Sequence, residues 1–310
     1  MRIYHGIKAF EKIQYPVVTS GTFDGVHQGH QKIIKKLQHL ATDKQGETVI
    51  ITFWPHPKYV LNPGSSMKLL TTFEEKAELL RSLGIDHLIR IPFTREFSQK
   101  TSGEFVEEIL VKKIGTKQLV IGYDHRFGKN REGSFEYLQT NASRYGFEVK
   151  EISRKDVDHI AVSSTKIREY ILNHRIHLAN KLLGRFYGIS GLVVKGQQLG
   201  RKIGFPTANL EITEDYKLIP SDGAYAVLAS VDGNQYSGMM NIGVKPTVGS
   251  ASRTIEVHIF NLDRNLYNER LNVQVVKQLR PEMKFNNLEE LTDQLHQDRN
   301  EAEEILHKHL

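Results

Sequence analysis

One stretch restricts what this chain can fold into more than any other: residues 21–30 read GTFDGVHQGH. It follows a short apolar run at residues 17–18 and precedes apolar residues at helical spacing over residues 33–40. A strand, a glycine-rich turn and a helix in that order direct backbone N–H groups at a phosphate. His27 and His30 stand where the helix is predicted to begin, and imidazoles there can donate hydrogen bonds to phosphate oxygens. The pattern favours a phosphate site over a tight turn with two surface histidines.

Length and composition are those of an ordinary globular protein. The 310 residues favour two domains, and 39% hydrophobic with 25% charged residues is typical of a folded chain. The formal net charge of +6 suits a polyanionic partner, and ATP meets that requirement as well as nucleic acid does. Because the chain has no long run of basic residues, a nucleic-acid-binding tail is disfavoured.

The sequence contains no cysteine, which excludes disulfides, thiolate catalysis and cysteine-ligated zinc. The first residues lack the apolar core of a signal peptide. The longest apolar runs, such as residues 49–51, are too short to cross a bilayer. We therefore expect a cytoplasmic protein that has no membrane partner.

The first half alternates predicted strands with predicted helices. Strand-like segments lie at residues 17–18, 47–53, 87–93 and 119–121, and helical patterns at residues 33–40, 72–84, 101–115 and 134–145. This alternation predicts a Rossmann-like α/β domain, with a parallel sheet covered by helices on both faces.

Ligands bind beyond the carboxyl ends of the strands in such sheets. Three turns follow predicted strands, at residues 21–30, 54–57 and 122–128. In the third turn, Asp124 and Arg126 are expected to contact a ligand. His56 in the second turn fits a structural turn as well as it fits a ligand contact.

A second helix start lies at residues 163–168, which read SSTKIR. Hydroxyl side chains at a helix N-terminus are ordinary caps. They also mark a second positive helix end, and Arg168, one turn inside, can form paired hydrogen bonds with a phosphate. The α/β alternation stops after this helix, which predicts domains at residues 1–183 and 184–310.

From residue 187 the pattern changes to short β segments. They lie at residues 188–194, 225–231, 235–242, 254–260 and 271–278, with turn signals between them. This spacing predicts a small antiparallel β-barrel. A final helix is predicted from Asn287, with acidic residues in its first turn and its apolar side chains toward the barrel.

The loop at residues 196–209, GQQLGRKIGFPTAN, is glycine-rich and basic. It is not a Walker A loop, because three residues rather than four separate Gly196 from Gly200 and no Lys-Ser/Thr follows. It can still wrap a polyphosphate. Thr207 and Asn209, two apart on an extended segment, would place oxygens on one side, and Mg²⁺ needs only one or two protein oxygens beside phosphates and water.

Glu256 is the candidate for a general base in the second half. On an alternating strand, Ile255 and Val257 face one way while Glu256 and His258 face the other. A glutamate on such a strand is more often an exposed surface residue than a general base. A kinase that acts on an alcohol, however, benefits from a group that takes the hydroxyl proton.

Four of these stretches resemble known motifs. Residues 21–30 resemble the H-x-G-H signature of the nucleotidyltransferase superfamily and, over the longer string, the bacterial bifunctional riboflavin kinase/FMN adenylyltransferase family. Residues 163–168 resemble the second motif of that superfamily, which faces the first across the ATP triphosphate. Residues 204–209, GFPTAN, are similar to a riboflavin kinase motif, and Glu256 stands in the E-x-H-x-F context of the catalytic glutamate of those kinases.

The resemblance covers nearly the whole chain and implies two sequential reactions. In the barrel, ATP phosphorylates the ribityl 5′-hydroxyl of riboflavin to give FMN and ADP. In the α/β domain, FMN attacks the α-phosphate of a second ATP to give FAD and pyrophosphate. The implied cofactor is Mg²⁺, with ATP as co-substrate. The implied partners are riboflavin, FMN and ATP, without nucleic acid or membrane, for a monomer or weak homo-oligomer.

The resemblance also implies roles for individual residues. The expected catalytic residues are Glu256, His27, His30 and Arg168. Expected to bind ATP or flavin during adenylyl transfer are Gly21, Phe23, Asp24, Gly29, Asp124, Arg126, Ser163, Ser164 and Thr165. Expected to bind ATP or flavin in the kinase are Gly196, Gly200, Lys202, Gly204, Phe205, Pro206, Asn241 and Arg280. Thr207 and Asn209 are the expected metal ligands.

Two other functions fit part of the sequence. A different adenylyl- or cytidylyltransferase with an appended barrel fits residues 21–30 but not residues 204–209. A basic RNA-binding or flavin-sensing module is disfavoured, because aromatic residues are not interleaved with a basic stripe and no RNP-like string occurs. Flavin sensing could coexist with catalysis.

Overall fold

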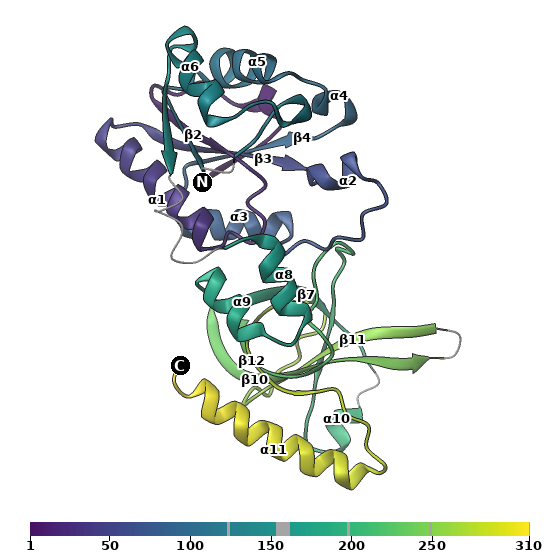
Figure 1. Cartoon of the computed structure of the whole chain (residues 1–310). Coiled ribbons are helices and arrows are strands. Elements are labelled where there is room, and N and C mark those ends of the chain that lie inside the picture. Colours follow the sequence, from purple (N-terminus) through teal and green to yellow (C-terminus); the bar gives the residue numbers. More distant parts are fainter. Residues whose placement is uncertain (123–124, 153–161, 197–198, 248–249, 310) are drawn as a thin grey trace. The chain divides into compact units, whose positions relative to one another are not determined.

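The computed structural model describes residues 1–122, 125–152, 162–196, 199–247 and 250–309 (Figure 1). It divides into two compact units. The first contains Met1–Met67 and Phe73–Ser163, and the second contains Lys68–Thr72 and Ser164–Leu310.

The first unit is built on a six-stranded sheet. Its strands are β1 (Arg2–His5), β2 (Pro16–Ser20), β3 (Glu47–Trp54), β4 (His87–Pro92), β5 (Gln118–Gly122) and β6 (Glu148–Ile152). They lie in the order β1-β4-β3-β2-β5-β6, and every neighbouring pair is parallel. All five residues of the central strand β2 are buried, as expected of a strand covered on both sides. The predicted parallel sheet is confirmed.

Helices cover both faces of this sheet. They are η1 (Ile7–Ala9), α1 (Gln28–Asp43), α2 (Pro57–Leu61), α3 (Phe73–Ser82), α4 (Arg95–Ser98), α5 (Ser102–Glu104), the π-helical η2 (Phe105–Ile114), η3 (Lys129–Arg131) and α6 (Phe135–Tyr145). Figure 1 shows α1 and α3 on one face and α5 and α6 on the other. The side chains of β3 alternate accordingly, since Val49 and Ile51 lie in one core cluster and Ile50 in the other.

The second unit is a closed barrel. Its strands are β7 (Tyr187–Val194), β8 (Ala208–Glu211), β9 (Gly223–Val231), β10 (Asn234–Thr247), β11 (Ser250–Ile259) and β12 (Arg270–Pro281). They close in the order β10-β11-β8-β7-β12-β9, with antiparallel pairing throughout. The predicted barrel is confirmed, but the sequence patterns missed β8. This four-residue strand bridges β11 and β7, so it completes the barrel.

The barrel unit also holds the helices α8 (Ser164–Leu172), α9 (Ile176–Leu183), α10 (Leu199–Lys202) and α11 (Leu288–Leu306). Asn287 caps α11 as predicted, because its Oδ1 accepts a hydrogen bond from Glu290 N at 2.8 Å. The helix α9 is fixed to the barrel by Asn180, which donates to Val275 O at 2.9 Å and accepts from Tyr187 N at 2.8 Å. For this reason the compact barrel unit begins before residue 184. The functional boundary at residue 183 stays a prediction.

Candidate active sites

The first site is the loop between β2 and α1. His27 is the N-cap of α1, and its Nδ1 accepts a hydrogen bond from His30 N at 3.4 Å. Because Nδ1 accepts, a neutral His27 ring carries its proton on Nε2. The two imidazoles are stacked, with ring centroids 3.7 Å apart and an angle of 14° between the planes. The predicted arrangement of two histidines at a helix N-terminus is therefore present.

The backbone of this loop takes an unusual path. Phe23 (φ 48°), Gly25 (φ 80°) and Val26 (φ 39°) all lie in the left-handed region, which β-branched residues such as valine avoid. The side chains of Phe23 and Val26 are buried in the core below the sheet edge. Their burial offsets the backbone strain, so the loop is held in one conformation. Phe23 is thus a core residue, and contact with a flavin through its ring stays a prediction.

The third predicted turn is described only in part. Asp124 lies outside the described residues, and Arg126 is exposed. The neighbouring His125 places its Nε2 3.4 Å from Ser20 Oγ, at the carboxyl end of β2. Ser20 was not among the predicted site residues. The only signal for it was its place as the last residue of a strand that leads into the glycine-rich loop.

The second motif begins a helix, as predicted. Ser164 and Thr165 form the first turn of α8, and Ser163 precedes it. Arg168 lies one turn inside, with Nε donating to Lys68 O at 2.7 Å. That these residues face the first motif across a triphosphate stays a prediction.

In the barrel unit, Thr207, Asn209 and Glu256 lie together. Asn209 on β8 pairs in register with Glu256 on β11, and Thr207 Oγ1 lies 3.4 Å from Glu256 Oε2. On its other side, Glu256 pairs with Asn241 of β10. Directly paired residues in an antiparallel sheet project from the same face. Asn209, Glu256 and Asn241 therefore form a row of oxygen-bearing side chains that crosses three strands.

Two glycines in the preceding loop allow this packing. A Cβ at position 196 would overlap the side chain of Asn209, and a Cβ at position 200 would overlap the Phe205 carbonyl and lie 3.7 Å from Thr207 Oγ1. Gly204 has φ +81°, a conformation that other residues rarely adopt. Gly196 and Gly200 are therefore needed for close packing around the predicted metal ligands, and Gly204 is needed for the backbone conformation of the loop. The side chain of Lys202 lies outside the described part of the chain.

His258, which was not among the predicted site residues, supports the same loop. Its Nδ1 donates to Pro206 O at 2.7 Å, and Phe205 is buried between the rings of His258 and His296. Burial lowers the pKa of His258 below its ordinary value, so the ring is neutral at pH 7. The alternation along β11, which points His258 the same way as Glu256, was the available signal.

Arg280 is a predicted ligand contact, and in the structure its guanidinium group forms an ion pair with a carboxylate of α11. Its Nε and Nη2 lie 3.0 and 2.8 Å from the oxygens of Asp298, and the two side chains are only 14% and 4% exposed. Gln294 also donates to Asp298, at 2.9 Å. The geometry makes Arg280 a residue that fixes α11 to the barrel.

This pair leads to a stability prediction. Removing Asp298 leaves the Arg280 charge buried without its partner, so Asp298→Ala should lower the free energy of unfolding by about 3 kcal/mol. Guanidinium denaturation of the purified protein would measure the change. On the same helix, the Arg299–Glu303 pair is much more exposed, so Glu303→Ala should cost less than about 0.5 kcal/mol. Equal effects of the two substitutions would contradict the prediction.

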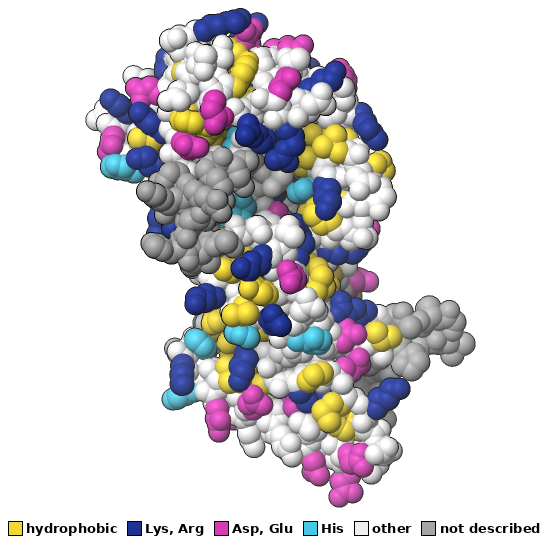
Figure 2. Space-filling view, in the orientation of Figure 1, with side chains coloured by type: hydrophobic (Ala, Val, Ile, Leu, Met, Phe, Trp, Pro, Cys, Tyr) yellow, Lys and Arg dark blue, Asp and Glu magenta, His cyan; other side chains and the backbone are white. Residues whose placement is uncertain are grey.

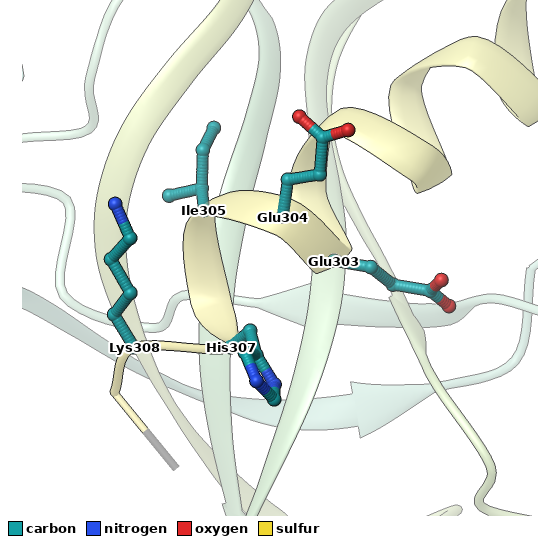
Figure 3. Close-up of a pocket in the computed structure, with 5 residues that line it drawn as sticks. All are labelled: Glu303, Glu304, Ile305, His307 and Lys308. Carbon is teal, nitrogen blue, oxygen red and sulfur yellow. The ribbon is translucent and has the colours of Figure 1, made fainter.

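Glu303, Glu304, Ile305, His307 and Lys308 line a hollow at the end of α11 (Figure 3). Its two carboxylates would repel a polyphosphate. On the face drawn in Figure 2, Lys and Arg side chains are mixed with acidic ones. No helix in the described residues is both long enough and apolar enough to cross a membrane.

The fold presents two groups of residues that are predicted to bind nucleotides, as in a nucleotide-dependent transferase. One is the N-terminus of α1, capped by His27 beside a parallel sheet, and the other is a glycine-rich loop beside a carboxylate on a barrel. Comparisons with known proteins identify the particular family. The family model described as FAD synthetase matches residues 10–166, and the model described as riboflavin kinase matches residues 183–306.

Curated relatives match both halves at once. "Bifunctional riboflavin kinase/FMN adenylyltransferase" of Buchnera aphidicola is 39% identical, with 96% of each chain covered. The proteins of the same name from Listeria monocytogenes and Escherichia coli K12 are 39% and 35% identical, over 91% and 93% of this chain and 90% and 92% of their own. The chain therefore belongs to the bifunctional riboflavin kinase/FMN adenylyltransferase family, and its two activities are those of a riboflavin kinase and an FMN adenylyltransferase.

A solved structure has the same fold over nearly the whole chain. It is titled as a macrolide-efflux protein from Streptococcus pneumoniae and is 29% identical, with a TM-score of 0.86 and coverage of 96% of this chain and 97% of that one. The likeness spans both units and supports the architecture described above.

Proposed function

We propose that residues 1–183 carry out FMN adenylylation and residues 184–310 riboflavin phosphorylation. The matched ranges of the two family models support this division. We further assign the first reaction to the loop at residues 21–30 together with Ser164, Thr165 and Arg168. We assign the second reaction to Glu256 and the loop at residues 196–209.

Adenylyl transfer requires charge stabilisation more than proton removal. The phosphate of FMN is already ionised, so its oxygen can attack the α-phosphorus of ATP without a general base. One P–O bond forms as another breaks, and pyrophosphate leaves. The protein must supply donors around this crowded anion, and the imidazoles of His27 and His30 at the α1 N-terminus are such donors.

Phosphorylation of riboflavin has a different requirement. The 5′-hydroxyl is a neutral alcohol, and its proton must leave as the oxygen attacks the γ-phosphorus and ADP departs. Glu256 is the carboxylate placed to take that proton, because Thr207 and Asn209 lie beside it. The main support for the assignment is that Glu256 on β11 lies beside Asn209 on β8 and beside Thr207, which immediately precedes β8.

We propose Mg²⁺ as the cofactor of both reactions, with ATP as co-substrate. In the barrel, Thr207 Oγ1 and Asn209 Oδ1 would hold the ion, which would neutralise phosphate charge when bound. The residues fit, since both carry oxygen ligands of the kind that Mg²⁺ prefers, and Gly196 lets the loop backbone pack directly against Asn209. No cluster of His, Asp or Glu suited to a metal occurs among the described residues, which is compatible with an ion held mainly by phosphates and water.

The metal assignment predicts an altered Mg²⁺ requirement. Thr207→Val should raise the Mg²⁺ concentration for half-maximal riboflavin phosphorylation by about tenfold, because one oxygen ligand is lost. Thr207→Ser keeps the hydroxyl and should restore the wild-type value. The Mg²⁺ dependence of FMN adenylylation serves as the internal control and should not change. A Thr207→Val variant with an unchanged Mg²⁺ requirement for the kinase would contradict the assignment.

One assay tests the overall proposal. Purified protein is incubated with riboflavin, ATP and Mg²⁺, and riboflavin, FMN and FAD are separated chromatographically over time. FMN should appear first and FAD second, and EDTA should stop both. FAD formation from supplied FMN without any phosphorylation of riboflavin would reject the kinase assignment.

We also propose that the partners are small molecules, namely riboflavin, FMN and ATP, without nucleic acid or membrane. A cytoplasmic location suits a cysteine-free chain whose co-substrate is ATP. Light scattering after size-exclusion chromatography would test whether the protein is a monomer or a weak homo-oligomer.

A further inference from the structure

A buried lysine lies beneath the loop at residues 21–30. Lys76 on α3 is only 3% exposed. Its Nζ donates to Thr22 O at 2.8 Å and to Thr52 Oγ1 at 3.4 Å. The hydroxyl of Thr52, on β3, in turn donates to the same Thr22 carbonyl at 3.3 Å. The carbonyl at the start of the loop is therefore held from α3 and from β3.

Burying an ammonium group is costly unless other groups compensate for it. Burial lowers the pKa of Lys76 to about 8, with Asp24 opposing that shift and Arg90 adding to it. Asp24 is itself only 2% exposed. The lysine and the aspartate thus compensate each other below the loop, on the side opposite to solvent. Lys76 has no role in the predicted adenylyl-transfer step and is not among the predicted site residues.

The loop needs such an anchor. Phe23 and Val26 hold positive φ angles between the Thr22 carbonyl and His27. Strained residues of this kind persist only when their surroundings enforce them. If the Thr22 carbonyl moved slightly, this rigid segment would move with it and would shift His27 at the N-cap position of α1. Displacements of about 1 Å at a catalytic group can cost a large part of the rate.

We propose that Lys76 is a positioning residue for adenylyl transfer, which sets the place of His27 and His30 by holding the Thr22 carbonyl and balancing Asp24. The proposal rests on the assignment of adenylyl transfer to the loop at residues 21–30. Lys76 is not proposed to contact the substrate; it acts by fixing the position of the loop.

The test is the variant Lys76→Met, which keeps the length of the side chain and removes its charge and its hydrogen bonds. The kcat of FMN adenylylation should fall at least about tenfold, while riboflavin phosphorylation by the same preparation stays within about twofold. Glu74→Gln, an exposed position on the same helix, should leave both activities within about twofold. An adenylylation rate of Lys76→Met equal to that of wild type would overturn the proposal.

The pH profile gives a readout that a purely structural role would not move. Since the ammonium loses its proton near pH 8, wild-type adenylylation should decline as the pH rises through that value. Asp24 and Arg90 are the charged groups that act on Lys76. The decline should be absent from Lys76→Met. A wild-type profile that stays flat through pH 8 would overturn the proposal even if the variant failed to fold.

Two further variants distinguish failure of the proposed role of Lys76 from failure of the loop assignment. Thr52→Val removes one of the two donors to Thr22 with little change in volume, and should lower adenylylation about threefold without affecting the kinase. His30→Ala tests the loop assignment itself. If His30→Ala is inactive in adenylylation but Lys76→Met and Thr52→Val are not, the role of Lys76 is rejected. If His30→Ala remains active, the site assignment is rejected instead.

Discussion

Replacing His30 with alanine should yield a protein that converts riboflavin to FMN and stops there. The imidazole of His30 lies in the first turn of α1, stacked on His27. Donors aimed at developing phosphate charge contribute about 10²–10³-fold in rate each, so FAD formation from supplied FMN should fall by that factor. Riboflavin phosphorylation depends on the other unit and should be unchanged. FMN should therefore accumulate in the chromatographic assay.

His39 provides a matched control for this experiment. It lies on the same helix with its side chain 65% exposed, 3.6 Å from Asp43. His39→Ala removes an imidazole from α1 without touching the loop, and both activities should stay within about twofold of wild type. If FAD formation by His30→Ala were as fast as by His39→Ala, the loop would not be the adenylyl-transfer site.

Replacing Glu256 should have the opposite result. Without a carboxylate to take the hydroxyl proton, Glu256→Ala should lower the kcat of riboflavin phosphorylation by about 10²–10⁴-fold. The conservative variant Glu256→Gln keeps the size and the contact with Thr207 but cannot accept the proton, so it should be nearly as slow. FMN adenylylation should remain nearly intact in both. Measuring each half-reaction separately, with riboflavin or FMN supplied, distinguishes these effects.

Glu211 is the control carboxylate for this series. It is exposed and lies at the end of β8, the strand that also carries Asn209. Glu211→Gln changes the charge of the barrel by the same amount and should leave phosphorylation within about twofold. Equal loss of both activities in Glu256→Ala would show a general defect of the protein and would reject the division of labour between the two halves.

The features of the fold that could be predicted from the sequence are those that depend on short-range residue patterns. Alternating strand and helix periodicities predicted the parallel sheet, and evenly spaced β segments predicted the barrel. The helix starts at Gln28, Ser164 and Leu288 follow recognisable capping or dipole signals. The residue order around Glu256 also predicted that His258 points the same way as Glu256.

Other features depend on pairings that no local pattern encodes. The strand β8 is only four residues long, and it exists because β7 and β11 offer it hydrogen-bonding partners on both sides. Arg280 is expected to contact a ligand from the family resemblance, and that stays a prediction, but its ion-pair partner could not be predicted from the sequence. Its carboxylate, Asp298, lies on a helix beyond the barrel strands.

Lys76 is the clearest example of a residue whose contacts could not be predicted from the sequence. In sequence it is one charged residue in a helix rich in charged residues, and nothing nearby distinguishes it from Glu74 or Glu75. Folding brings Lys76 of α3 to Thr52 of β3 and to Thr22 of the loop after β2, and this buries its ammonium group. Residue order thus specified the two motifs that are predicted to bind nucleotides and the layers that carry them. Which side chains hold those motifs in place was settled by long-range packing, because burial and charge pairing arise only between segments that meet in the folded chain.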